Sequence, residues 1–271
     1  MTAAVILDMP EDEYHAHPAL SQSGAKLILK APSLYRWRMD NPQTDSEALD
    51  HGKAAHALVL GVGAELVVVD SDSWRTKAAQ EARDEARAAG KVPLLPDQYA
   101  VIQAMAARLS EHRLAMELLS QGDPEVSLFA TDPTTGVPIR GRLDWLSPAI
   151  ATDYKTTREL TPDAFKRTCA TFGYHMQAAW YLDLLELVGQ PREAFAFIVQ
   201  AKEPPYDVFV TDLTGRAIDR GRELNARAIE RFRDCTASGQ WPPAVSPSAY
   251  ITTDLPAWAY YDNDLDEEYA L

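Results

Sequence analysis

Two aspartates and a lysine lie close together in the segment 141–157, GRLDWLSPAIATDYKTT. Asp153 and Lys155 are two residues apart in a strand-like run, so we expect both side chains on one face and Tyr154 on the other. Asp144 lies near the end of the preceding strand, and a hairpin-like return can bring it beside Asp153. Converging carboxylates repel each other unless a cation lies between them, and oxygen ligands suit Mg²⁺ or Mn²⁺. The pattern predicts a divalent metal site beside an ammonium group, which could orient or deprotonate water or stabilise charge on a phosphate.

A plainer interpretation of the same residues is a structural salt bridge at a sheet edge, because a lone Asp-x-Lys is a common pattern. The surroundings favour the metal site. The pattern ends a predicted core strand in an otherwise apolar run, and Asp144 precedes it on another strand. Buried charges are rare unless they are paired or bind a metal.

The elements that must position these residues include a run of three consecutive strands. A turn at Thr134–Gly136 separates the first two, which predicts an antiparallel meander. Two more strands follow after intervening helices, so the fold class is α/β (α+β), with a central mixed β-sheet flanked by helices. The predicted strands of this core are 125–132, 137–147, 149–157, 193–204 and 206–214.

Helical periodicity and capping residues predict the remaining elements. A capped helix begins near Ser21 and is broken by Pro32, after which a second short helix follows. A further strand is predicted at 65–70. The other predicted helices are 47–61, 74–90, 96–120, 161–170, 174–188 and 214–238.

The chain shows neither an internal repeat nor a clean linker, so residues 1–240 are expected to form a single domain. Its helical part would be 1–122 and its core of sheet and helices 123–240. Residues 241–271 are proline-rich and then acidic, which predicts an extended wrap followed by a tail. The acidic run 262–268 could dock a partner or act as a DNA mimic, although a solvated tail is the simpler interpretation.

Composition narrows the function further. The 271 residues include 26 Lys and Arg against 40 Asp and Glu, a formal net charge of −14. That excess argues against a protein that holds DNA by a uniformly positive surface, but it allows a local basic channel. We expect no membrane-spanning segment, since no uncharged apolar stretch reaches about 18 residues. The acidic N-terminus does not resemble a secretory signal and only two cysteines are present, so a reducing cytoplasm is the expected location.

Several motifs occur in the order of a known family. The run G-R-L-D-W-L, then D-Y-K-T-T, then Y-H-M-Q-A-A-W-Y resembles the PD-(D/E)XK nuclease superfamily. Gln177 and Tyr181 resemble the Q-x-x-x-Y helix motif of its RecB-type branch, and Gly52 with His56 resembles that branch's G-x-x-x-H motif. Together with E-Y-H-A-H-P-A-L-S-Q-S near the N-terminus, residues 12–240 are most similar to phage and prophage exonuclease VIII (RecE-type) nuclease domains.

The resemblance implies a restriction-endonuclease-like core and assigns roles to individual residues. Asp144 and Asp153 would be metal ligands, and Lys155 would be the catalytic lysine. Gln177 and Tyr181 would position the DNA strand or the lysine. His56 would be a further ligand or an organiser of the site. The Tyr154 carbonyl and Glu125 are the other ligands implied, and the metal would be Mg²⁺, with Mn²⁺ possible.

Each of these residues also has an ordinary structural interpretation. His56 could be a satisfied structural histidine, and His51 and His175 are equal candidates for a site. Gln177 and Tyr181 could be the polar edge of an amphipathic helix. Some RecB-type relatives carry an iron–sulfur cluster, but Cys169 and Cys235 cannot supply its four ligands, so no such cluster is expected.

Basic residues near the predicted site could contact DNA phosphates. Arg142 and Arg158 bracket it in the sequence, and Arg36 alternates with Tyr35 and Trp37, which would suit base stacking. These side chains could equally be ordinary surface and core residues. The candidate phosphate contacts are Arg36, Lys53, Arg142 and Arg158, within a wider set of Lys26, Lys30, Arg38, Arg140, Lys166 and Arg167.

The predicted activity is metal-dependent phosphodiester hydrolysis. The resemblance implies a 5′–3′ exonuclease on double-stranded DNA ends, a single-strand annealing recombinase as partner, and a ring-shaped homo-oligomer. Three alternatives stay open: a nicking or structure-specific endonuclease on the same scaffold, a non-catalytic DNA-binding or assembly protein with a relict nuclease fold, and a metal-dependent hydrolase of small molecules.

Overall fold

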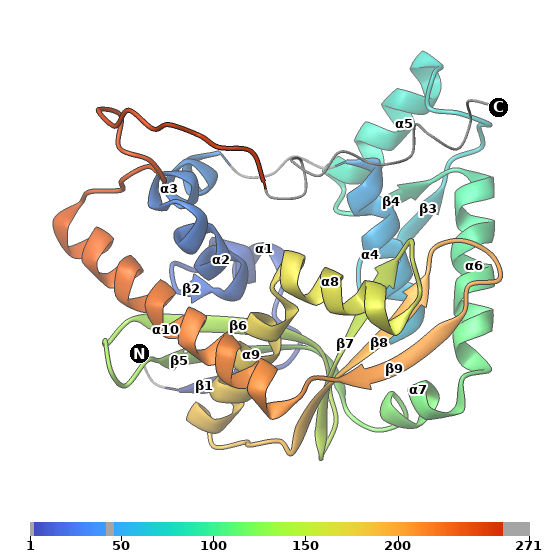
Figure 1. Cartoon of the computed structure of the whole chain (residues 1–271). Coiled ribbons are helices and arrows are strands. Elements are labelled where there is room, and N and C mark those ends of the chain that lie inside the picture. Colours follow the sequence, from blue (N-terminus) through green and yellow to red (C-terminus); the bar gives the residue numbers. More distant parts are fainter. Residues whose placement is uncertain (1–2, 42–45, 257–271) are drawn as a thin grey trace, which may run out of the picture.

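The centre of the fold is a mixed β-sheet with strand order β1-β5-β6-β7-β8-β9 (Figure 1). The computed structural model describes residues 3–41 and 46–256, so the acidic run 262–268 lies outside the described residues. β7 and β8 pair in parallel and the other neighbours on this path are antiparallel. The predicted meander is therefore confirmed. The strands are β1 Ala4–Ile6, β5 Asp123–Thr131, β6 Pro138–Leu146, β7 Ile150–Thr157, β8 Ala194–Ala201 and β9 Val208–Asp212.

β6 and β7 pair only at their connected ends, where Trp145 faces Thr152 and Leu146 faces Ala151. The far half of β6 pairs instead with the short strand β2, Leu20–Ser21. The two strands therefore separate beyond Trp145 and Thr152. We call this point the strand fork, and Asp144 and Asp153 are the first residues beyond the last pair.

The larger hydrophobic core lies between the sheet and a layer of helices formed by α2, α8, α9 and α10. Two glycines, which have no side chain, allow the elements of this core to approach each other closely. A Cβ on Gly141 of β6 would lie 2.6 Å from the ring of Tyr181 on α9, and one on Gly221 of α10 would lie 2.1 Å from the carbonyl oxygen of His175. These helices are α2 Gln22–Lys30, α8 Pro162–Phe172, α9 Tyr174–Leu187 and α10 Gly215–Ser238.

A second core lies against Tyr154 and Ile198 of the sheet and is covered by α4, α6 and α7. The Tyr154 hydroxyl donates to Gln200 Oε1 at 2.6 Å, and Gln200 Nε2 donates to the Met105 carbonyl at 2.8 Å, so these two buried side chains are paired. A small parallel sheet of β3 and β4 lies beside it together with α5 (Figure 1). The elements are α4 Glu47–Leu60, β3 Leu66–Val68, α5 Lys77–Ala88, β4 Val92–Leu94, α6 Pro96–Ser110 and α7 Arg113–Leu118.

Local sequence signals set many of the helix ends. A Ser or Thr side chain caps five of the helices by accepting the N–H three residues on, which satisfies a backbone donor that the helix leaves free. Gly61 and Gly173 end α4 and α8 in the left-handed conformation that glycine adopts without strain. The capping residues are Ser21, Ser46, Thr76, Thr161 and Thr214.

Two sequence predictions need correction here. The helix expected at 96–120 is two helices, because the chain breaks at Glu111 and the His112 ring then accepts the Ala115 N–H at 3.2 Å to start α7. The strands β1, β2 and β4 and the short helix α1, Glu11–Ala16, are not predicted from the sequence. Each has two to six residues, which is too few to show a hydrophobic periodicity. The helix α3, Pro32–Asp40, begins at the proline that was expected to break the first helix.

Residues 241–256 follow α10 without a helix or a strand and run past α3 (Figure 1). The Trp241 ring stacks on Tyr35 with 5.5 Å between centroids, and the Pro242 carbonyl accepts the Ser33 N–H at 3.1 Å. This part of the expected wrap is thus in contact with the helical layer. Within the described ranges, none of the helices has the length and apolarity needed to cross a membrane.

Candidate functional site

Three side chains from three different elements converge at the strand fork. His56 of α4, Glu125 of β5 and Asp144 of β6 each offer one ligand atom, and these atoms all lie within 4.8 Å of one another. His56 Nδ1 lies 3.6 Å from Asp144 Oδ2. We call these three residues the acidic cluster. An imidazole nitrogen with two carboxylates is a donor set that suits a divalent cation such as Mn²⁺ or Mg²⁺.

An irregularity in the sheet turns two of these side chains toward each other. Glu125 and Asp144 occupy opposite positions of β5 and β6, and Glu125 has a left-handed backbone with φ 51°. Leu143 and Leu146 both lie in the larger core although they are three residues apart, so the alternation of β6 shifts by one between them. The left-handed conformation costs a non-glycine residue about 1–2 kcal/mol. The strained residue, Glu125, faces Asp144. Strained backbone conformations of this kind cluster at functional sites.

The acidic cluster is electrostatically unfavourable without a cation. Burial raises the pKa of Glu125 to about 7, and the charge of Asp144 adds to the rise. Arg142, whose Nε lies 3.8 Å from Glu125 Oε2, acts in the opposite direction but does not outweigh them. A divalent cation would relieve this repulsion, so the residues present fit a bound metal ion.

Asp144 is also fixed by the backbone of β7. Its Oδ2 accepts the Tyr154 N–H at 2.9 Å, so a side-chain carboxylate takes the place of a strand partner in the fork. The Tyr154 ring packs edge-on against the His56 ring, with 5.5 Å between centroids. Tyr154 thereby touches two members of the acidic cluster and supports their positions.

Asp153 and Lys155 form an ion pair on the other side of the fork. Lys155 Nζ lies 2.5 Å from Asp153 Oδ2, and Gln177 of α9 donates from Nε2 to Asp153 Oδ1 at 2.7 Å. We call Asp153 and Lys155 the lysine pair. Asp153 and Lys155 share one face of β7 and Tyr154 lies on the other, as strand alternation predicts.

Burial and neighbouring charges act together on the lysine pair. Burial raises the pKa of Asp153 to about 6, Asp144 raises it further, and Lys155 opposes both. For Lys155, burial alone would lower the pKa, but the carboxylates of Asp153 and Asp144 outweigh burial and the pKa rises. The ammonium form of Lys155 is therefore favoured.

The two predicted metal-binding aspartates turn in different directions. Asp144 points toward His56 of α4, whereas Asp153 points toward Gln177 of α9. The group of ligand atoms within 4.8 Å includes Asp144 but not Asp153. The fork thus brings both carboxylates together closely enough for Asp144 to raise the pKa of Asp153, without placing them on one set of ligand atoms.

Tyr181 lies one helical turn after Gln177 and is largely enclosed. Its ring stacks on Phe195 with 5.7 Å between centroids and fills the space above Gly141. Burial raises the pKa of Tyr181 well above its usual value, and the side chain of Gln177 acts in the opposite direction. Gln177 lies one helical turn before Tyr181 and donates to Asp153.

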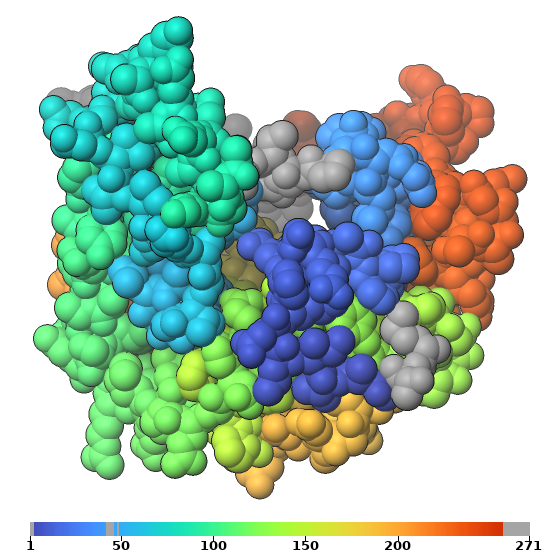
Figure 2. Space-filling view, turned by 180° about the vertical axis from the view of Figure 1, so that it is seen from behind, coloured from blue at the N-terminus to red at the C-terminus, as the bar shows by residue number. Residues whose placement is uncertain are grey.

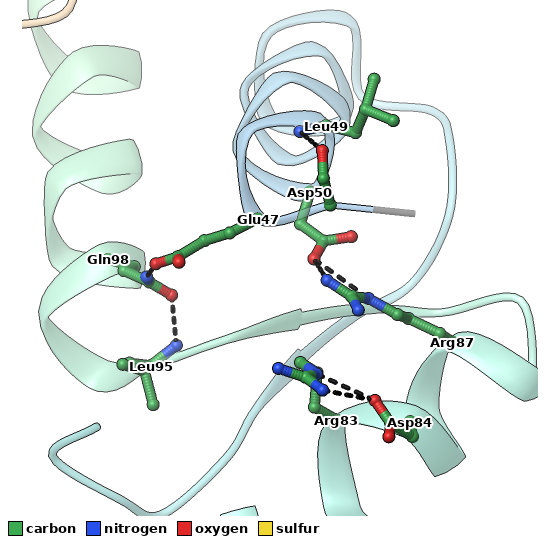
Figure 3. Close-up of polar contacts among 9 residues, drawn as sticks. Glu47, Leu49, Asp50, Arg83, Asp84, Arg87, Leu95 and Gln98 are labelled. Carbon is green, nitrogen blue, oxygen red and sulfur yellow. Dashed lines mark hydrogen bonds and ion pairs between the residues drawn. The ribbon is translucent and has the colours of Figure 1, made fainter. Parts of the chain in front are cut away.

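The helix that carries His56 is anchored by polar contacts at its start (Figure 3). Asp50 is buried and accepts from Arg87 of α5 at 2.6 Å, and Glu47 accepts from Gln98 of α6. These contacts lie within the first turns of α4, ahead of His56. They fix the direction of the helix and so the position of its imidazole.

The rival histidines do not join the acidic cluster. The His175 ring lies 3.2 Å from the Cys169 carbonyl oxygen, and His51 Nε2 is buried without a hydrogen-bond partner among the described residues. Of these three histidines, His56 is the one found in the metal-binding group within the described ranges.

The four predicted phosphate contacts occupy different environments. Arg142 is enclosed by the N-terminal segment: it donates to the Met9 carbonyl and its guanidinium lies 4.7 Å from the Tyr14 ring centroid. Figure 2 shows the N-terminal part of the chain, in dark blue, lying against green parts of the surface. Arg142 is therefore not the open phosphate contact that its sequence position suggested. Lys53 lies 3.3 Å from Glu11, and Arg158 is exposed just after β7.

The predicted stacking surface around Arg36 also needs correction. Tyr35 is buried against Trp241 and Phe232, so its ring is not available to a base. Arg36 forms an ion pair with Asp40 one turn along the same helix. Trp37 remains 56% exposed. Consecutive residues of a helix point in different directions, so Tyr35, Arg36 and Trp37 do not form one surface.

Sequence reasoning missed one aromatic residue beside the lysine pair. Lys155 Nζ lies 5.0 Å from the ring centroid of Tyr174, the first residue of α9. The available signal was its position directly after Gly173, where the chain turns back from α8 into α9 beneath the fork.

The sequence from residue 21 to residue 253 matches a family described as "PDDEXK-like domain of unknown function", DUF3799. No curated protein matches the chain. A solved structure described as a "Putative exonuclease" from Eubacterium rectale is 12% identical, with a TM-score of 0.61, over 93% of this chain and 97% of that chain. A phage related exonuclease from Haemophilus somnus 129PT is 10% identical, with a TM-score of 0.34, over 83% of this chain and 98% of that chain.

The similarity to the Eubacterium rectale structure extends over nearly the whole of both chains and shows the fold, a mixed sheet flanked by helices of the PD-(D/E)XK type. The family match covers well over half of the sequence, including both halves of the strand fork. The chain therefore belongs to the PDDEXK-like DUF3799 family.

Proposed function

We propose that this protein is a metal-dependent deoxyribonuclease. The observation that carries the proposal is the meeting of the acidic cluster and the lysine pair at the strand fork. Membership of a PDDEXK-like family supports it, and two structures similar to this chain are described as exonucleases. Phosphodiester hydrolysis needs stabilisation of growing negative charge and a positioned water, and the fork gathers groups suited to both.

In this proposal His56, Glu125 and Asp144 hold a divalent cation, Mg²⁺ or Mn²⁺. Asp153 and the Tyr154 carbonyl are the further ligands that the resemblance to RecB-type nucleases implies. When bound, the ion would acidify a water molecule and neutralise charge on the phosphate. The protein holds the cluster in place through α4 on one side and the β7 backbone on the other.

In this proposal Lys155 stabilises negative charge on the phosphate and does not remove a proton from the attacking water. Its raised pKa keeps the ammonium group protonated near neutral pH, and a protonated lysine donates hydrogen bonds and positive charge. Asp153 and the Tyr174 ring hold the ammonium in place. Gln177, one helical turn before Tyr181, holds Asp153 in turn.

The proposed substrate is the end of a linear DNA duplex, degraded 5′ to 3′ as the resemblance to exonuclease VIII implies. A ring-shaped oligomer and a single-strand annealing recombinase as partner belong to the same proposal. The net charge of −14 restricts DNA to a local positive surface, and the exposed Arg158 just after β7 is a proposed phosphate contact of this kind.

The test is digestion of end-labelled linear duplex DNA and of covalently closed circular DNA, in Mg²⁺ and in EDTA. The proposal expects short products from the linear DNA in Mg²⁺ alone, with the circle intact. Lys155→Ala should lose this activity, whereas Lys77→Ala, a change at an exposed lysine of α5, should keep it. Cleavage of the circle would replace the exonuclease with an endonuclease, and an inert wild-type protein would contradict both.

A further inference from the structure

We propose that Phe172 is a stacking platform for an unpaired nucleobase near the lysine pair, and that Lys26 contacts the phosphate of the same nucleotide. The inference rests on the proposed nuclease function and concerns the nucleotide at the end of the DNA substrate. It assigns to the enzyme a preference for DNA whose end is unpaired or frayed.

A row of stacked rings leads from the core to the surface. Phe197 is fully buried and stacks on Tyr174 with 5.6 Å between centroids and 27° between planes. Tyr174 stacks on Phe172 at 6.0 Å and 24°. Phe172 is 56% exposed, so the outermost ring of the row is open to solvent. A planar base placed on it would continue a stack that the protein has already built.

The row passes directly beside the lysine pair. Lys155 Nζ lies 5.0 Å from the centroid of Tyr174, the middle ring. A nucleotide stacked on Phe172 is therefore one ring removed from the ring that Lys155 contacts. A base at that place belongs to the strand whose phosphate lies at the fork, or to its immediate neighbour.

Phe172 is held in position rather than left on a loose loop. It is the last residue of α8, and Gly173 turns the chain with φ 69° straight into α9. Lys26 of α2 donates from Nζ to the Phe172 carbonyl at 2.9 Å, and its side chain lies over Gly173, where a Cβ would be 3.0 Å from Lys26 Cδ. Three helices thus fix the ring before any ligand arrives, which lowers the entropy that binding would cost.

Lys26 supplies the charge that a nucleotide needs beside a stacking ring. Its ammonium lies next to Phe172, and burial followed by the nearby charge of Lys155 lowers its pKa. Two ammonium groups that repel each other favour an anion in their vicinity. A phosphate linked to the stacked base would satisfy both.

The exposed face of a single ring selects an unpaired base over an intact duplex. Bases inside a duplex already stack on each other and present only their edges, whereas a splayed base offers its flat face to an aromatic side chain. Phe172 is 56% exposed, so its ring can meet such a splayed base.

The test compares two DNA ligands, a forked duplex with a short unpaired end and the blunt duplex of the same paired sequence. Binding is measured by fluorescence anisotropy in EDTA, so that the DNA stays intact. Phe172→Ala should weaken binding of the forked duplex by about tenfold and change the blunt duplex less. Phe172→Tyr, which keeps the ring, should retain the wild-type affinity. Tyr250→Ala is the control and should bind both DNAs as the wild type does, because Tyr250 is an exposed aromatic residue outside the fork.

A second readout does not depend on how the alanine variant folds. A 2-aminopurine at the unpaired position should lose fluorescence when wild-type protein stacks on it, and Lys26→Gln should weaken forked-duplex binding as well. Unchanged 2-aminopurine fluorescence in the wild-type complex would overturn the inference while leaving the nuclease proposal standing. Wild-type protein that neither binds nor cleaves any of these DNAs would overturn both.

Discussion

The acidic cluster and the lysine pair lie on opposite sides of one strand fork, yet they are built on different electrostatic principles. The acidic cluster places two carboxylates and a histidine close together. Burial and repulsion between the carboxylates raise the pKa of Glu125 to about 7. The lysine pair carries its own counter-ion, because Lys155 lies 2.5 Å from Asp153. The first arrangement calls for a cation from outside, and the second is complete within the protein. In our proposal the acidic cluster therefore supplies the main ligands of the cation, with Asp153 as a further ligand, and Lys155 carries the positive charge for the phosphate.

The largest expected effect comes from removing one carboxylate of the acidic cluster. Asp144→Asn should reduce hydrolysis by on the order of 10²–10³-fold, because the cation loses a charged ligand. The amide oxygen can still accept the Tyr154 N–H, so the melting temperature should change little. Initial rates and thermal melts of the same preparations check this. A variant that cleaves at the wild-type rate would remove Asp144 from the site.

The lysine pair should respond in stability as well as activity. Lys155→Ala leaves Asp153 buried without its counter-ion, which should cost about 3 kcal/mol in the free energy of unfolding. The double change Asp153→Ala with Lys155→Ala should cost less than the sum of the single changes, because no charge is left unpaired. Urea denaturation of the four proteins measures the coupling, and strictly additive effects would mean that the pair does not interact.

The acidic cluster also predicts how stability depends on pH. The pKa of Glu125 is raised in the folded protein, so the folded state binds the proton more tightly than the unfolded state does. Glu125 therefore lowers stability as the pH rises from about 4.5 to about 7 in metal-free protein.

Glu125→Gln should remove this contribution, and the difference between variant and wild type in denaturation at several pH values isolates it from the similar effect of Asp153. A saturating divalent cation should flatten the wild-type profile in the same way. Parallel pH profiles of wild type and variant would show that the pKa of Glu125 is not raised in the folded protein.

The smallest expected effect lies outside both groups. Tyr154→Phe deletes the hydroxyl that donates to Gln200 inside the second core and should cost about 1 kcal/mol. The Tyr154 N–H to Asp144 is a backbone contact and survives the change, so activity should be retained. A large loss of activity in this variant would mean that the second core, and not only the fork, shapes the site.

Much of this arrangement could be predicted from the sequence because it depends on local periodicity. The alternation of β7 places Asp153 and Lys155 on one face, and the four-residue spacing on α9 brings Gln177 and Tyr181 together. The turn and the strand lengths predict that Asp144 returns to the neighbourhood of Asp153.

What could not be predicted depends on tertiary contacts between distant segments. The shift in alternation of β6 lies opposite the left-handed Glu125 of another strand, and Asp144 there lies in one ligand group with His56 and not with Asp153. The enclosure of Arg142 depends on an N-terminal segment 133 residues away in sequence. Phe172 and Lys26 meet across 146 residues, and neither belongs to a recognisable motif.

The central claim is that the acidic cluster binds a divalent cation, and calorimetric titration with Mn²⁺ tests it most directly. Wild-type protein and Asp144→Asn are titrated under the same conditions near neutral pH, with Lys77→Ala as the control. The account predicts saturable binding to wild type and to the control, and binding at least about tenfold weaker in Asp144→Asn. Equal affinity in all three proteins, or no binding to any of them, would contradict it.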